Sequence, residues 1–238
     1  MVFALMASCE YSSFHVCCNG RELTCPRSAL AISNLFDMTV RESWKCKNCG
    51  EIHAQTPKYR GFGGLSIANA SHALLEQHIG NYLAPETVDH LACDSAECDG
   101  SKDVRTREKA IVRGPEILVI QLSRFDWDFK KNRPIESKRV VRYEQRLDLS
   151  HWTADESPLE YKLRGVVGHA GKEPSHGHYI AGLKCQNERE YAIANDSRIR
   201  CFDSDAPLLF ESPLTKGFDA CILVYQKVGG GRVNLIQA

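Results

Sequence analysis

Two pairs of closely spaced cysteines constrain this chain more than any other feature of its sequence. Cys46 and Cys49 stand in a CxxCG turn, and four residues separate Cys93 from Cys98. Both spacings are typical of zinc ligands, and the glycine after Cys49 gives the backbone the freedom that such a tight turn uses. We therefore predict that Cys46, Cys49, Cys93 and Cys98 form one tetrahedral zinc site that fastens two distant segments of the chain.

The predicted zinc ion has a structural role. Four protein ligands leave no open coordination position, so the ion activates no water. Ordinary free cysteines are the alternative, and a zinc ribbon that binds nucleic acid is another. The second alternative is disfavoured because 30 basic and 30 acidic residues cancel and the segment DSAECD around Cys93 and Cys98 is acidic. We predict no nucleic-acid partner.

The remaining composition points to an intracellular protein. No stretch approaches the roughly 18 apolar residues of a membrane span, and the opening MVFALMA has no basic region of the kind that precedes a secretion signal. The 11 cysteines are therefore expected to be reduced thiols and metal ligands rather than disulfides. We predict no membrane contact and a location in the cytoplasm, the nucleus or both.

Local patterns predict a strand-rich α+β fold. The segment ALAISNLFDM (29–38) is compatible with a short helix, and SHALLEQHIG (71–80) predicts a second one, with Asn69 or Ser71 as its N-cap and Gly80 as its stop. Downstream, β-branched and aromatic runs alternate with turn residues, which predicts mainly antiparallel strands. These runs are EILVIQLSRF, VVRY, YKLRGVVGHAG, HYIAGLKC, EYAIAND and ACILVYQKV.

Two polar residues stand at the ends of neighbouring predicted strands. His178 heads one strand and Asn195 ends the next, so antiparallel pairing would bring them close together. A histidine oriented by an amide is the base half of a cysteine-protease triad. On spacing alone, His169 and His176 are equally eligible, and ordinary strand-end residues are the alternative interpretation.

Several motifs, taken in order, resemble the ubiquitin-specific protease family of deubiquitinating enzymes. The resemblance covers roughly residues 35–227. CKNCG and the pair Cys93 and Cys98 are similar to the two zinc knuckles of the family, and Lys109 stands where the family has a lysine after the second. GPEILVIQLSRFDWD resembles the signature strand Pro-x-x-Leu-x-x-x-Leu-x-Arg-Phe, and GHYIAGLK, YAIANDSRIRCF and DACILVYQK resemble the His box, the Asn/Asp box and the closing strand.

The resemblance implies a papain-like cysteine-protease fold with zinc-ribbon fingers and an antiparallel palm sheet. It makes His178 the general base, Asn195 the residue that orients it, and Asp196 a nearby polar group that helps to position the site or the oxyanion. It also predicts a divergent segment over residues 1–34, a partial protease domain over 35–228 and a flexible tail over 229–238. Within the domain, the fingers are expected over 42–112 and the palm over 113–228.

The chain departs from this family at the nucleophile. Nothing resembles the family's Cys box, Gly-x-x-Asn-x-x-x-x-Cys-Tyr-x-Asn, or the Gln-Asp-Ala box that follows it. Only residues 26–45 lie between Cys25 and Cys46, too few for the helical thumb that carries the thiol, so the thumb is expected to be largely missing. Cys25, beside Pro26 near a predicted helix start, is the substitute nucleophile to test first.

Three functions follow from these observations. The resemblance implies thiol-dependent removal of ubiquitin from proteins, with this chain a truncated or inactive version of the enzyme. The alternatives are a non-catalytic module that binds ubiquitin or serves as a scaffold, and a zinc-ribbon interaction domain. Expected partners are ubiquitin or a ubiquitinated protein, together with a second chain that covers the apolar palm face which a missing thumb would expose.

Overall fold

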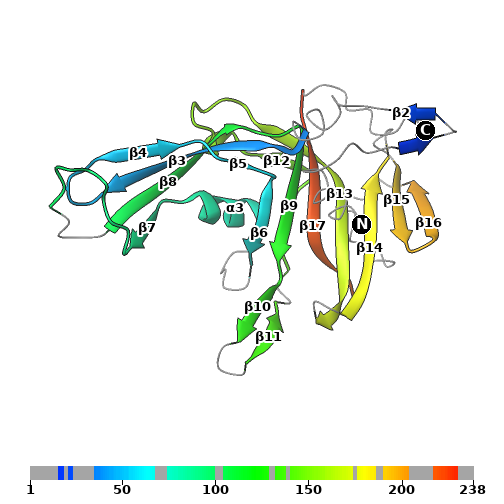
Figure 1. Ribbon diagram of the computed structural model, residues 1–238. Helices are drawn as coiled ribbons and strands as arrows, with labels where there is room; N and C mark the ends of the chain where they lie inside the picture. Colours follow the sequence, from blue (N-terminus) through cyan, green and yellow to red (C-terminus); the bar gives the residue numbers. More distant parts are fainter. Residues whose placement is uncertain are drawn as a thin grey trace.

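A computed structural model describes most of the chain. The described residues are 16–18, 21–23, 35–67, 74–99, 104–128, 132–137, 140–173, 176–185, 190–203 and 217–229. They form two large β-sheets, two short hairpins and one well-defined helix (Figure 1). The strand-rich α+β fold expected from the sequence is confirmed. The described residues include no helix long and apolar enough to cross a membrane.

The larger sheet has eight strands in the order β16-β15-β14-β13-β17-β9-β6, with β12 also paired to β13. All pairs are antiparallel except β6 with β9. The strands are β6 (Phe62–Ser66), β9 (Ile117–Ser123), β12 (Arg146–Asp148), β13 (Glu160–Glu173), β14 (His176–Lys184), β15 (Glu190–Asn195), β16 (Arg198–Asp203) and β17 (Asp219–Lys227). The pairs among the runs predicted to be mainly antiparallel are antiparallel, and the parallel pair involves β6, which lies upstream of those runs.

The smaller sheet has five strands in the order β4-β3-β8-β7, with β5 also paired to β3. Its strands are β3 (Met38–Cys46), β4 (Ile52–Gln55), β5 (Lys58–Tyr59), β7 (Glu86–Asp89) and β8 (Val104–Arg113). Two hairpins stand apart, β1 (Val16–Cys18) with β2 (Arg21–Leu23) and β10 (Phe125–Asp128) with β11 (Arg133–Glu136). The predicted domain limits at 34, 112 and 228 stay predictions. The strands of the smaller sheet all end by residue 113, and those of the larger sheet, apart from β6, begin after it.

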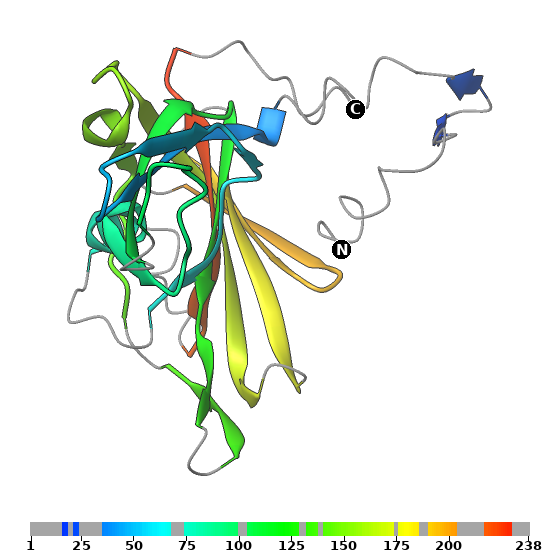
Figure 2. The same ribbon diagram turned by 60° about the vertical axis from the view of Figure 1, so that its left-hand side comes forward.

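The core forms where the sheets and one helix meet. Helix α3 (Leu75–Leu83) contacts β6 of the larger sheet and β8 of the smaller one, and it buries Leu75, Ile79 and Leu83. With the short 3₁₀ helix η1 (Ser150–Trp152), it lies on one side of the larger sheet (Figure 2). Leu223 and Tyr225 of β17 are fully buried on that side. Burial of this apolar surface is the main force that holds the strands together.

The second predicted helix exists, but its limits were wrong. It extends past Gly80 to Leu83, and Pro85 follows the last turn. Gly80 lies inside the helix. The Trp152 ring packs against it, and a Cβ atom at this position would lie only 3.2 Å from that ring. Leu74 is the N-cap, and its backbone N–H donates to Gln77 Oε1 at 3.4 Å. The predicted caps at Asn69 and Ser71 lie outside the described residues.

Two other local predictions also need correction. Met38 starts strand β3, where it pairs with Tyr59, rather than ending a helix. Residues 29–34 of that predicted helix lie outside the described part. The run VVRY forms no strand; Arg142 makes only an isolated bridge with Leu74, and Tyr143 is buried in the core. Burial explains the apolar residues Val141 and Tyr143 without sheet pairing, whereas Val140 is exposed.

Candidate active site and metal centre

His178 and Asn195 lie together at one end of the larger sheet. His178 Nε2 is 2.6 Å from Asn195 Oδ1. The arrangement follows from strand register, since Ala181 of β14 pairs with Ala194 of β15 and the two side chains project beyond the last pair of that ladder. The sequence expectation that antiparallel pairing joins these residues therefore agrees with the geometry.

This hydrogen bond selects the tautomer of the neutral imidazole. An amide oxygen only accepts, so Nε2–H of His178 must be the donor. The proton is then on Nε2, and Nδ1 keeps the lone pair that a general base uses. The His178 side chain is 43% exposed, so a reacting group has access to it from solvent.

Asp196 lies beside the pair in the turn between β15 and β16. Its φ angle of 51° is left-handed, a conformation that aspartate tolerates better than most residues. Its Oδ2 is 3.9 Å from His178 Nε2, and its side chain is 79% exposed. The carboxylate can stabilise a protonated imidazole, but Asn195 makes the shorter contact.

Phe218, which the sequence analysis did not assign to the site, and Gly177, which the sequence predicts to leave room for a substrate backbone, shape the surroundings of His178. The Phe218 ring meets the imidazole edge-on, with a centroid distance of 5.9 Å. Gly177 leaves room for the buried His169, because a Cβ atom at position 177 would collide with His169 Nε2 and lie 2.7 Å from the Ala170 carbonyl oxygen. No spacing rule relates Phe218 to His178, since they lie 40 positions apart.

The other candidate histidines differ from His178. His169 is 2% exposed and packs against the Tyr179 ring at 4.5 Å, so it is a buried side chain rather than an accessible base. His176 is in β14, but its side chain lies outside the described part. Of the two candidate histidines whose side chains the structure describes, His178 is the one that forms a hydrogen bond with Asn195.

The described cysteines place no thiol against His178. Cys221 Sγ donates to the Val167 carbonyl oxygen at 3.3 Å, and burial raises the pKa of that thiol. Cys185 lies at the far end of β14, and burial raises its pKa as well. Both shifts oppose thiolate formation, which a nucleophile requires. Cys25, the predicted substitute, lies outside the described residues.

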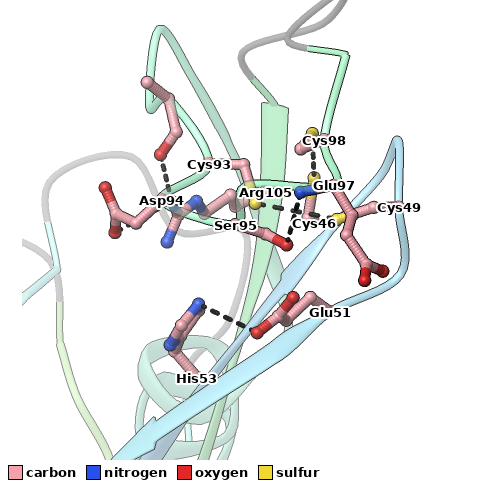
Figure 3. Close-up of polar contacts among 11 residues, drawn as sticks. Cys46, Cys49, Glu51, His53, Cys93, Asp94, Ser95, Glu97, Cys98 and Arg105 are labelled. Atoms are coloured by element: carbon pink, nitrogen blue, oxygen red, sulfur yellow. Dashed lines mark hydrogen bonds and ion pairs between the residues drawn. The ribbon is translucent and has the colours of Figure 1, made fainter.

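The four predicted metal ligands do come together. Their sulfur atoms all lie within 4.8 Å of one another. Cys46 Sγ is 3.8 Å from Cys98 Sγ, and Cys49 Sγ is 3.7 Å from Cys93 Sγ (Figure 3). Four sulfurs each 2.3 Å from a central ion stand about 3.8 Å apart, so the cluster has the dimensions of a tetrahedral thiolate site.

The backbone around Cys46 favours its thiolate, whereas burial and the neighbouring thiols raise the pKa of Cys49 and of Cys93. The Asn48 N–H donates to Cys46 Sγ at 3.4 Å. Hydrogen bonds from the backbone of Cys49 and Asn48 lower the pKa of Cys46 to about 6. Arg105, opposite Cys46 on β8, donates to the Ala92 carbonyl oxygen and lies 3.4 Å from Asp94 Oδ2, which ties the second cysteine segment to the sheet.

Lys109 of β8 joins helix α3 to the smaller sheet. Lys109 Nζ donates to the Tyr82 carbonyl oxygen at 3.2 Å and lies 4.3 Å from the centre of the Tyr82 ring. Desolvation lowers the pKa of Lys109. The lysine that the motif comparison singled out therefore anchors α3 to β8, which is a structural contact.

The fold and site define a class: a strand-rich domain with a cluster of four cysteines and, on its large sheet, a hydrogen-bonded His–Asn pair. The family model described as "Ubiquitin carboxyl-terminal hydrolase" matches residues 8–225. The chain belongs to this family, and its fold is that of the ubiquitin-specific proteases.

Curated relatives carry the same family name. The chain is 26% identical over 207 residues to ubiquitin carboxyl-terminal hydrolase 4 of Arabidopsis thaliana, covering 83% of this chain and 54% of that protein. It is 24% identical over 207 residues to ubiquitin carboxyl-terminal hydrolase 13 of Saccharomyces cerevisiae, covering 85% of this chain and 27% of that protein. The chain thus spans about half or less of the length of these relatives.

Solved structures support the fold. A yeast SAGA deubiquitinase module, Ubp8/Sgf11/Sus1/Sgf73 bound to ubiquitin aldehyde, matches with a TM-score of 0.68 and 18% identity, covering 83% of this chain and 42% of that one. The module with a substituted Ubp8, bound to monoubiquitin, matches with a TM-score of 0.71 and 18% identity, covering 87% and 45%. At this identity the likeness concerns the fold.

Proposed function

We propose that this chain binds ubiquitin and carries the base half of a deubiquitinase site, and that it hydrolyses no isopeptide bond by itself. The 2.6 Å contact between His178 Nε2 and Asn195 Oδ1, in a chain of this family, carries the proposal. The two SAGA modules bound to ubiquitin aldehyde and to monoubiquitin support ubiquitin as the ligand. Absence of a thiol beside His178 among the described cysteines supports the lack of turnover.

The complete reaction assigns a step to each group. A base at His178 Nδ1 takes the proton of a thiol, and the thiolate attacks the carbonyl carbon of the ubiquitin C-terminal glycine. The protonated imidazole gives its proton to the leaving amine, and water then hydrolyses the thioester. Asn195 holds the ring throughout, and Asp196 stabilises its charged form. Without a thiol at Nδ1, the first bond never forms.

We propose that the metal is zinc and that it is structural. Four thiolates at tetrahedral spacing leave no position for water. Its contribution is to hold the β3–β4 turn against the segment around Cys93 and Cys98, and thereby to keep one end of the smaller sheet ordered. An intracellular location, in the cytoplasm or nucleus, is also a proposal, and reduced thiols in the cluster agree with it.

A second chain over the large sheet remains part of the proposal. Tyr179 and Leu183 of β14 are 52% and 51% exposed, and Ile199 of β16 is 69% exposed. The pairings of Ala181 with Ala194 and of Ala194 with Ile199 place these side chains on the sheet face opposite Ile180, which is buried. An apolar strip of this kind favours association.

The decisive test combines binding and turnover on the zinc-loaded chain. Titration of ¹⁵N-labelled ubiquitin should shift its resonances, while a fluorogenic ubiquitin C-terminal substrate should show no turnover. His53→Ala is the matched control, since His53 is an exposed histidine of β4 on the other sheet. His178→Ala should leave the fold intact and alter the shifts of the ubiquitin tail only.

Two outcomes would contradict the proposal. Turnover that disappears in His178→Ala and persists in His53→Ala would mean that a thiol of this chain completes the site, and Cys25→Ala would then test the predicted substitute. A folded sample with neither binding nor turnover would reject ubiquitin as the ligand.

A further inference from the structure

A basic pocket lies in the larger sheet far from His178. Its volume is ≈ 220 Å³. The lining residues are Gln145, Arg146, Lys162, Leu163, Arg164 and Lys184. Four of these side chains are cationic and none is acidic. On β13, Lys162 lies eight positions before Ala170, the residue opposite His178, so about 26 Å of strand separates the pocket from the His–Asn pair.

The pocket forms where β13 changes its neighbour. Strand β14 ends at Lys184, and β12 begins at Arg146, which lies opposite Lys162 of β13. Between these two strand ends, the Leu163 N–H donates to the Gln145 carbonyl oxygen at 2.8 Å. β12 and β14 both pair with β13, at successive stretches of that strand (Figure 1 labels all three). Strand ends rather than a long loop therefore position the cationic side chains.

Two of the cations have polar neighbours, and one of the two is held in place. Arg164 Nε donates to Gln226 Oε1 at 2.8 Å, which fixes its guanidinium over the sheet. Arg146 Nη1 lies 3.5 Å from Glu160 Oε2 at the rim, and its side chain is 67% exposed. That exposed pair is weak and exchangeable. Because the chain has a net charge of zero, this concentration of positive charge is local.

We propose that this pocket docks an acidic segment of a partner protein. Its volume equals that of about seven water molecules, enough for one or two carboxylate side chains. Lys162 and Arg164 are two positions apart on a strand, which corresponds to about 7 Å. Alternate side chains of an extended peptide have the same spacing, so an extended segment with acidic residues at alternate positions matches the cations. This inference is independent of ubiquitin binding.

The test measures binding of a fluorescein-labelled hexaglutamate peptide to the full chain by anisotropy at low salt. A labelled hexaserine peptide controls for non-specific association. The variant Arg146→Glu/Lys184→Glu reverses two pocket charges, and Lys58→Glu/Arg60→Glu makes the same change at exposed positions of the smaller-sheet region. Circular dichroism melts establish that both variants fold, and Arg146→Gln alone, at an exposed side chain, is the mild second variant.

The proposal predicts that the pocket variant weakens hexaglutamate binding by about tenfold or more, that Arg146→Gln weakens it by about two- to fivefold, and that the control variant leaves it unchanged. Raising the salt concentration should weaken it further. The proposal is overturned if hexaglutamate does not bind, if both double variants weaken it equally, or if inorganic phosphate or a single-stranded oligonucleotide binds the pocket in its place.

Discussion

Removal of the metal should disorder the end of the smaller sheet and leave the larger sheet folded. The segment from His90 to Asp99 has no regular secondary structure, and most of its side chains are exposed. Its ties to the rest of the fold include the cysteine cluster, the hydrogen bond from Asn48 Nδ2 to Cys98 Sγ and the Arg105 contacts with Ala92 and Asp94. A metal that joins all four thiolates would add a strong restraint on this segment.

The magnitude follows from linkage between binding and folding. At a free zinc concentration of about 1,000 times Kd, binding stabilises the folded state by about 4 kcal/mol. A domain has a total stability of about 5–15 kcal/mol. Loss of the metal should therefore lower the melting temperature clearly. Cys98→Ala should have a similar effect, because three thiolates bind the ion less tightly than four.

Three measurements check this prediction. Metal analysis should give one zinc per chain for the wild type and for Cys201→Ala, an exposed cysteine outside the cluster, and much less for Cys98→Ala. Thermal unfolding with and without chelator should show the loss of stability. Hydrogen exchange should accelerate much more in residues 86–99 than in residues 161–170. Full zinc content in Cys98→Ala, or equal exchange in both segments after chelation, would refute the reasoning.

Three further predictions concern the larger sheet. Leu223→Ala should lower the free energy of unfolding by about 2–5 kcal/mol in urea titrations, since Leu223 is fully buried, whereas Leu183→Ala, at an exposed position, should cost less than about 0.5 kcal/mol. Gly177→Ala should move β14 and weaken the ubiquitin-tail shifts without preventing folding, because its Cβ would collide with His169. Burial raises the pKa of Tyr225 above that of an unfolded tyrosine, which titrates near pH 10. The contribution of the neutral Tyr225 side chain to folding stability should therefore be complete below about pH 10 and decrease as the pH rises further. In pH-dependent unfolding measurements, Tyr225→Phe should reduce that decrease, and an unchanged slope would contradict the assignment.

The sequence correctly predicted strands where a run of β-branched and aromatic residues also pairs within a sheet. The runs at 161–171 and 220–228 became β13 and β17, which pair through the centre of the larger sheet. It did not predict the parallel contact between β6 and β9, because the short run FGGLS has two glycines and little periodicity. The run VVRY was misassigned because burial against the core gives the same apolar pattern as a strand.

The site residues divide in the same way. Spacing found the four cysteines, since two knuckle-like pairs are specific even without knowledge of the fold. His178 and Asn195 needed the order of motifs as well, because His169 and His176 were equally eligible on spacing. Phe218 was not predictable, since its contact with His178 depends on how the sheet places β14 and β17 on the two sides of β13. Tertiary proximity of this kind leaves no local pattern.

The His–Asn pair does not need a thiol in order to form. Its geometry depends on the pairing of β14 with β15 and on the turn at Asp196, both of which are internal to the larger sheet. In the proposed mechanism, His178 is therefore oriented without a nucleophile beside it, so base orientation and thiol supply are separable functions. A chain that keeps the first without the second would retain recognition of the ubiquitin tail while losing turnover, which is the combination that the binding and substrate assays distinguish.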